Sequence, residues 1–236
     1  MIFKKVKKKV WDVVILSPHM DDALLSLGQH IINWKKECKK IKIITMVNSF
    51  GRSEKIPLYS KEYINKSGFK KVFDFEKARR VEDRRVMNKL DVSYEYWSII
   101  DASFRSERRI FKYPKRKDLL SGKVVESDQK MVADLVLKLN KIRTKKMLIP
   151  YGVGGHVDHI ILRKVGEESK IKNKFYYLES PYLWEKLNWL EIIKSLLKIK
   201  SILREISDKN KLLKVYKSQY QLWGENKNNY LELIIK

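Results

Sequence analysis

Near the start of the chain, a predicted buried strand is followed by a short polar cluster and then directly by a helix. Residues 11–17 (Trp-Asp-Val-Val-Ile-Leu-Ser) are mostly apolar and β-branched, like the central strands of parallel sheets. Apolar residues repeat at helical spacing from Asp22 to Ile31, and Asp22 is placed to cap that helix. A second strand is predicted over 42–47. This strand-helix-strand unit favours a parallel sheet with helices packed on its faces.

The same alternation continues along the rest of the chain. We predict a helix over 75–90, a strand over 94–100, a helix over 129–142, a strand over 147–149, a helix over 160–168, a strand over 175–178 and a largely helical segment over 189–220. Residues 51–72 are interpreted as a long irregular connection, which in a compact domain is often a substrate loop. The pattern therefore predicts a single α/β domain over residues 1–236, with a Rossmann-like, mainly parallel sheet flanked by helices.

Two polar clusters each follow a predicted strand, and together they contain three of the four histidines. The first holds His19, Asp21 and Asp22, and the second holds His156, Asp158 and His159. Because parallel strands end at the same edge of a sheet, we expect the clusters to form one site. Two imidazoles and a carboxylate with an open position for water are a ligand set of hydrolytic zinc and of non-haem iron(II). Each residue alone has an ordinary structural role, but their joint spacing favours a metal site.

Two neighbouring features are interpreted as structural. His30 lies inside the first predicted helix, away from both clusters. The glycine-rich run over 152–155 lacks the Lys-Ser/Thr pair of a P-loop and the GxGxxG spacing of dinucleotide-binding proteins. We therefore expect it to be a loop of close backbone approach and not a phosphate cradle.

The two clusters and their flanks resemble the PIG-L/LmbE-like family of zinc-dependent N-deacetylases. The strongest matches are residues 17–26 (SPHMDDALLS) and 155–159 (GHVDH). Weaker similarities occur at 79–83, 101–105 and 216–219, so the resemblance extends along most of the chain. Members of this family remove N-acyl groups, typically acetyl from N-acetylglucosamine units. The resemblance implies the same reaction on an N-acetylated amino sugar or glycoconjugate.

The sequence departs from the common family form at a few positions. Pro18 stands where Ala is usual, Met20 replaces Pro, and Ala23 replaces Glu. None of these changes removes a group from the expected metal site. Some family members carry a mobile Tyr two residues before the first His of the second motif, a position that is Gly154 here. Tyr151 is a candidate to replace that Tyr.

The resemblance implies the metal ligands and the general base. His19, Asp22 and His159 would bind the ion, which is expected to be Zn²⁺ with Fe²⁺ as the alternative. Metal-bound water would be the nucleophile and Asp21 its general base. This division is chemically reasonable, because the adjacent carboxylates of Asp21 and Asp22 cannot point in the same direction.

The resemblance also implies roles for the remaining polar residues. His156 would polarise the carbonyl group or protonate the leaving amine. Asp158 would hold His156 in the productive tautomer and raise its pKa. Arg79 and Asp101 are expected to contact the sugar, and an i,i+3 salt bridge to Glu82 is an equal alternative for Arg79.

The chain is strongly basic, with 52 Lys and Arg against 28 Asp and Glu and a net charge of +24. Basic runs occur at residues 4–9, 35–42 and 105–117. Such runs attract lipid-linked or phosphorylated glycans, anionic membrane surfaces or nucleic acid. An A/T-rich coding bias produces the same Lys excess. Because no helix-turn-helix, RRM or zinc-finger pattern is present, nucleic acid is the least favoured of these partners.

The sequence favours a cytoplasmic location, with peripheral contact at an anionic membrane as the alternative. Asp12 interrupts the apolar run behind the basic N-terminus, and no segment reaches the ~20 apolar residues of a spanning helix. Cys38, the only cysteine, excludes an internal disulfide. Two rival functions remain at this stage, a basic nucleic-acid-binding protein and an inactive, glycan-binding relative of the deacetylases.

Overall fold

The computed structural model describes residues 9–52, 55–182, 199–203, 207–223 and 232–236. The strands are β1 (Val10–Ser17), β2 (Ile41–Ser49), β3 (Ser93–Ile100), β4 (Ser106–Glu107), β5 (Ile110–Phe111), β6 (Arg143–Pro150), β7 (Lys174–Tyr177), β8 (Ile199–Leu203) and β9 (Glu232–Ile235). The helices are α1 (Asp22–Lys36), α2 (Leu58–Lys66), α3 (Val72–Lys89), α4 (Arg116–Leu119), α5 (Glu126–Gln129), α6 (Met131–Leu139), α7 (Val157–Glu168), α10 (Ser207–Leu213) and α11 (Lys217–Tyr220).

The main sheet has the strand order β3-β2-β1-β6-β7-β9-β8. The strands from β3 to β7 are parallel, and β9 pairs antiparallel with both β7 and β8. Chain order along the sheet reverses between β1 and β6, which is the switch point where open α/β sheets bind their ligands. The predicted fold class, a Rossmann-like α/β fold with a mainly parallel sheet, is confirmed.

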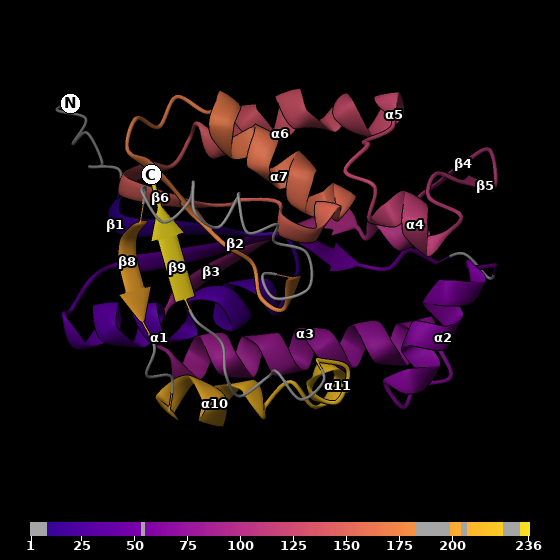
Figure 1. Ribbon diagram of the computed structural model, residues 1–236, viewed down its shortest axis with the longest axis horizontal. Helices are drawn as coiled ribbons and strands as arrows, with labels where there is room; N and C mark the ends of the chain where they lie inside the picture. Colours follow the sequence, from indigo (N-terminus) through magenta and orange to yellow (C-terminus); the bar gives the residue numbers. More distant parts are fainter. Residues whose placement is uncertain (1–8, 53–54, 183–198, 204–206, 224–231) are drawn as a thin grey trace, which may run out of the picture.

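Helices cover both faces of this sheet (Figure 1). α1, α3, α10 and α11 lie on one side, and α6 and α7 lie on the other. Each layer encloses its own apolar cluster, one built on α1 and the other on α6 and α7. The last five residues of β1 are fully buried because helices pack on both of its faces. Among the described residues, no helix combines the length and apolar character needed to cross a membrane.

The connection over 51–72 was predicted to be irregular, but it contains the helix α2. Only Ser60 and Ile64 of α2 are buried, so its sequence carries no apolar stripe that would announce a helix. The predicted helix over 129–142 is observed as α6, which begins at Met131 and ends at Leu139, and Gln129 is the last residue of the separate short helix α5.

The prediction of a largely helical segment over 189–220 is wrong at residues 199–203 and is met by α10 and α11. Residues 199–203 form β8, and helix resumes only at α10 and α11, whereas 189–198 and 204–206 lie outside the described residues. The partner of β8 is β9, at the far end of the chain, which local periodicity does not reveal. The Glu232 carboxylate of β9 accepts a hydrogen bond from the backbone N–H of Gln29 (2.8 Å). Its Oε2 lies 2.8 Å from His30 Nδ1. His30 therefore serves the attachment of β9 to α1.

Candidate metal and catalytic site

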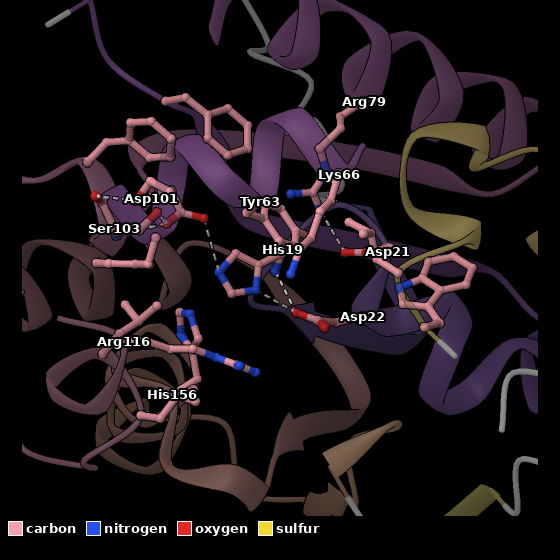
Figure 2. A pocket seen from close by; sticks show the side chains of 18 of the residues that line it. His19, Asp21, Asp22, Tyr63, Lys66, Arg79, Asp101, Ser103, Arg116 and His156 are labelled. Atoms are coloured by element: carbon pink, nitrogen blue, oxygen red, sulfur yellow. Dashed lines mark hydrogen bonds and ion pairs between the residues drawn. The ribbon is translucent and has the colours of Figure 1, made fainter. Parts of the chain in front are cut away.

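A cavity of about 400 Å³ lies at the switch point of the sheet. Its lining includes His19, Asp21 and Asp22 from the turn after β1 and His156 from the turn after β6. Figure 2 shows the side chains of His19, Asp22 and His156 facing a common space. The two polar clusters thus meet at one edge of the sheet, as their positions after parallel strands predict.

The turn after β1 is fixed by its own side chains. Ser17 Oγ donates a hydrogen bond to the carbonyl of His19 (2.7 Å) and accepts one from the backbone N–H of Ala23 (3.1 Å). We expected Asp22 to cap the first helix, but α1 begins at Asp22 itself, so Asp22 is not the capping residue. Its carboxylate instead turns back and accepts the backbone N–H of His19 (2.8 Å). This contact places the Asp22 carboxylate beside the His19 ring.

Three of the expected ligand atoms converge around Asp22. Its Oδ2 lies 2.9 Å from His19 Nδ1 and 3.3 Å from His159 Nε2. Donor atoms bound tetrahedrally to zinc at 2.0–2.1 Å are separated from each other by about 3.3 Å. His159 Nε2 is buried and makes no hydrogen bond within the described part of the chain. A buried ring nitrogen that faces a carboxylate at this distance without forming a hydrogen bond to it fits a divalent cation between the two groups.

The opposite nitrogen of each of these two histidines faces a buried carboxylate. Glu179 Oε1 lies 3.0 Å from His159 Nδ1, and Asp158 Oδ2 lies 3.2 Å from His19 Nε2. Metal-binding histidines are usually oriented in this way by an outer carboxylate. Glu179 was not predicted, although its position just after strand β7 obeys the same rule that indicated the two clusters.

Electrostatics separates the protonation states of the two ligand types. Burial raises the pKa of the Asp22 carboxyl, but neighbouring His159 and His19 outweigh burial and hold that pKa well below its ordinary value. Burial lowers the pKa of His159, but Asp22 and Glu179 outweigh it and raise this pKa to about 9. A carboxylate and two imidazoles are thus held together by strong mutual attraction, and a bound cation would replace the proton shared among them.

The family resemblance implied that the Asp158 carboxylate orients His156, but the structure places this carboxylate elsewhere. The carboxylate of Asp158 pairs with the Arg105 guanidinium and accepts the backbone N–H of Ala102 (3.0 Å). Arg105 also binds buried Asp128 (2.5 Å), so part of the basic run over 105–117 is internal and not a surface patch. Asp158 belongs to the environment of His19, because these paired charges direct its second oxygen there.

His156 is oriented instead by backbone. Its Nδ1 accepts a hydrogen bond from the backbone N–H of Asp158 (3.2 Å) at the start of α7. Nδ1 therefore carries no proton, and the neutral ring keeps its hydrogen on Nε2. Burial, with the nearby charges of His19 and His159, lowers the pKa of His156 well below its ordinary value, contrary to the expected rise. A neutral imidazole with an available Nε2–H can donate a hydrogen bond to a substrate carbonyl.

Two other groups of side chains have donor atoms close enough together to hold a metal ion. Ring nitrogens of His19, His156 and His159 lie within 4.8 Å of one another, as do donor atoms of His19, Asp101 and Asp158. Because Asp158 is already paired with Arg105, the set with Asp101 has less free charge to offer. The three imidazoles remain the geometric alternative to the set that includes Asp22.

Asp21 points away from the Asp22 carboxylate, toward α3. Its Oδ1 accepts a hydrogen bond from Arg79 Nη2 (2.8 Å), and both side chains are buried. Burial and Asp22 raise the pKa of Asp21, while the Arg79 guanidinium opposes that rise. Arg79 thus lines the cavity but is paired with Asp21, and the alternative pair with Glu82 is absent because Glu82 accepts the hydroxyl of Ser218 (2.5 Å).

Asp101 lies at the cavity as expected for a substrate contact. Its Oδ1 accepts the backbone N–H (2.9 Å) and the hydroxyl (2.6 Å) of Ser103, and its Oδ2 lies 3.7 Å from His19 Nε2. Sequence reasoning did not anticipate the aromatic part of the lining, which comes from several elements. This part consists of Phe50, Tyr59, Tyr63, Phe104, Tyr182 and Trp223.

Comparison with solved structures places these residues in a known fold. Teicoplanin deacetylase in its complex with teicoplanin superimposes with a TM-score of 0.73 at 16% identity, covering 95% of this chain and 97% of that one. N,N'-diacetylchitobiose deacetylase from Pyrococcus horikoshii gives 0.54 at 14% identity, covering 94% and 82%. GalB, a 4-carboxy-2-hydroxymuconate hydratase from Pseudomonas putida, gives 0.55 at 13%, covering 95% of both chains.

These identities establish the shared fold, and the hydratase shows that the fold alone does not determine the reaction. A search of curated proteins gives no match. Residues 14–169, however, match the family model described as PIG-L, GlcNAc-PI de-N-acetylase. That region contains both polar clusters and about two thirds of the chain, so the resemblance stated from the motifs is confirmed, and the chain belongs to the PIG-L family.

Proposed function

We propose that this protein is a zinc-dependent hydrolase that removes the N-acetyl group from an N-acetylated amino sugar or glycoconjugate. Membership of the PIG-L family and the deacetylases among its structural neighbours support an amide hydrolase. The observation that carries the metal assignment is the buried, unbonded Nε2 of His159, which lies beside Asp22 while Glu179 holds the other ring nitrogen. We assign His19, Asp22 and His159 as the ligands.

A divalent cation bound there supplies Lewis acidity and lowers the pKa of water. Asp21 then takes a proton from the attacking water as the water oxygen bonds to the amide carbon, and Arg79 holds the Asp21 carboxylate in place. His156 donates its Nε2–H to the carbonyl oxygen as negative charge develops there. Asp21 returns the proton to the amide nitrogen as the C–N bond breaks, which gives acetate and a free amine.

The cavity supports a sugar as the substrate. Its volume of about 400 Å³ accommodates a ring of hexose size, and its lining combines aromatic faces with a few polar groups. Asp101 lies on this lining beside His19, where its free oxygen can accept a sugar hydroxyl. Arg79 reaches the same cavity beside Asp21.

Two cations on the rim favour a substrate with an anionic substituent such as a phosphate. Lys66, at the end of α2, and Arg116, at the start of α4, both line the cavity and are exposed. Neither forms an ion pair with any other described residue. In the view of Figure 2 they approach His19 from opposite sides. An anion on the sugar would gain charge-assisted hydrogen bonds there at little cost in desolvation.

Acetate release from a panel of sugars tests the proposed function. N-acetylglucosamine and its phosphate esters are incubated with the zinc-loaded protein, the chelated protein and the Asp21→Asn variant. We expect acetate from the loaded protein, loss on chelation, recovery with zinc, and a rate at least about 100-fold lower in the variant. Absence of acetate with every sugar, despite full zinc loading, would contradict the proposal and leave the inactive glycan-binding relative.

The same panel tests the anionic substituent separately. The wild type should favour phosphorylated over neutral sugars in kcat/KM, and a Lys66→Met/Arg116→Met variant should lose that preference. Lys61→Met is the matched control, because Lys61 is exposed on α2 but does not line the cavity. Equal kcat/KM for both sugar types in the wild type would remove the anionic substituent from the proposal while leaving the deacetylase intact.

A further inference from the structure

Tyr182 reaches the catalytic cavity from a segment that the sequence motifs do not include. It lines the cavity with His19, Asp22 and His156, and its ring stands edge-on to the His159 ring at 5.6 Å between centroids. Glu179, three residues earlier, fixes this segment to the site. The Glu179 carboxylate accepts the backbone N–H of Gly152 (2.7 Å) and contacts His159, so Tyr182 is anchored to the second cluster.

The second cluster leaves space for this ring because it contains Gly154. A Cβ atom at Gly154 would lie 2.7–3.0 Å from three carbon atoms of Tyr182, closer than real Cβ contacts. Gly154 also has a positive φ of +83°, which a side chain would strain. The ring of Tyr182 thus occupies the space into which a side chain at position 154 would project.

Tyr151, the candidate drawn from the sequence, does not line this cavity. Its ring packs against the Arg163 guanidinium, 4.8 Å from the ring centroid, and against the Tyr176 ring at 6.1 Å. Tyr151 therefore belongs to the packing between β6, β7 and α7. Of the two tyrosines, only Tyr182 can meet a substrate bound at His19 and Asp22.

The Tyr182 hydroxyl is free to act as a hydrogen-bond donor. It forms no hydrogen bond with any residue that the structure describes. An ordinary phenol keeps its proton at neutral pH, so this hydroxyl can donate a hydrogen bond to a substrate bound in the cavity.

We propose that Tyr182 is a further catalytic residue, whose hydroxyl donates a hydrogen bond to the carbonyl oxygen of the scissile amide. This inference rests on the proposed deacetylase function. As the water oxygen bonds to the amide carbon, the C=O electron pair moves to oxygen, and the contacts from Tyr182 and His156 strengthen. The pair returns to form the carbonyl of acetate when the C–N bond breaks, and the phenol keeps its proton throughout.

The Tyr182→Phe variant tests this role, because it removes only the hydroxyl. We expect kcat to fall about 100-fold or more, the usual effect of losing one such donor. KM, zinc content and thermal midpoint should stay unchanged, because the ring still packs on His159. Tyr151→Phe is the matched control and should keep full activity. Unchanged kcat in Tyr182→Phe, or a fall matched by loss of zinc, would overturn the proposal.

An N-thioacetyl substrate distinguishes a direct contact from a structural effect. Sulfur accepts hydrogen bonds poorly, so the wild type should lose about 10-fold more kcat/KM on oxygen-to-sulfur exchange than Tyr182→Phe loses. Effects of sulfur on the metal cancel in this comparison, since both enzymes carry the same ligands. Equal losses in both enzymes would show that the hydroxyl does not touch the carbonyl oxygen. If the wild type releases no acetate at all, the deacetylase proposal fails first.

Discussion

Replacement of Asp83 by Asn should remove a pH dependence from the stability of this protein. Asp83 lies on α3, is fully buried, and accepts hydrogen bonds from the hydroxyls of Tyr96 (2.6 Å) and Tyr216 (2.7 Å). Burial raises the pKa of its carboxyl from 3.8 to about 7. The charge of nearby Asp21 adds to this rise, while the two hydroxyls and Arg79 oppose it.

The sign of the effect follows from the two pKa values. The folded protein keeps the Asp83 proton up to about pH 7, whereas the unfolded chain loses it near 3.8. The free energy of unfolding should therefore fall as pH rises through this window and level off above it, by at most about 4 kcal/mol. Urea unfolding of the wild type and Asp83→Asn at several pH values isolates this contribution, since other groups cancel in the difference. A difference that does not change with pH would refute the reasoning.

Two further predictions concern charges around the metal site. Arg105→Met leaves buried Asp128 and Asp158 without their shared guanidinium. The free energy of unfolding, measured with urea, should fall by about 3–5 kcal/mol. A fall below about 1 kcal/mol, which is typical of exposed ion pairs, would contradict this prediction. Glu179→Gln removes the charge that orients His159 and should weaken zinc binding about 10–100-fold in a chelator competition; unchanged zinc affinity would show that Glu179 serves only the backbone.

The centre of the fold could be predicted from sequence because local signals agree with the tertiary structure there. β1 is buried on both faces, so its sequence is a continuous apolar run, and its polar cluster follows directly. Only the last four residues of β6 are buried and apolar, and they lead in the same way to the second cluster. Topology then places both clusters at one edge of the sheet, because the two strands are parallel neighbours. The meeting of His19 with His159, at 5.3 Å between ring centroids, follows from this arrangement.

The sequence could not predict features that depend on distant partners. β8 lies within a segment whose apolar spacing is helical, and its partner β9 lies at the far end of the chain. The family resemblance assigned Asp158 to His156, but Arg105, 53 residues away, directs its carboxylate to His19. Tyr182 gave no signal at all, because its position depends on the space left by Gly154.

The central claim is that the turns after β1 and β6 hold one divalent ion through His19, Asp22 and His159. Metal analysis of the wild type and three alanine variants, after equal exposure to zinc and removal of excess, tests it most directly. The account predicts one ion per chain in the wild type and in Asp21→Ala, and little or none in Asp22→Ala and His159→Ala. Equal metal loss in all three variants, or a wild type that binds no ion, would contradict it.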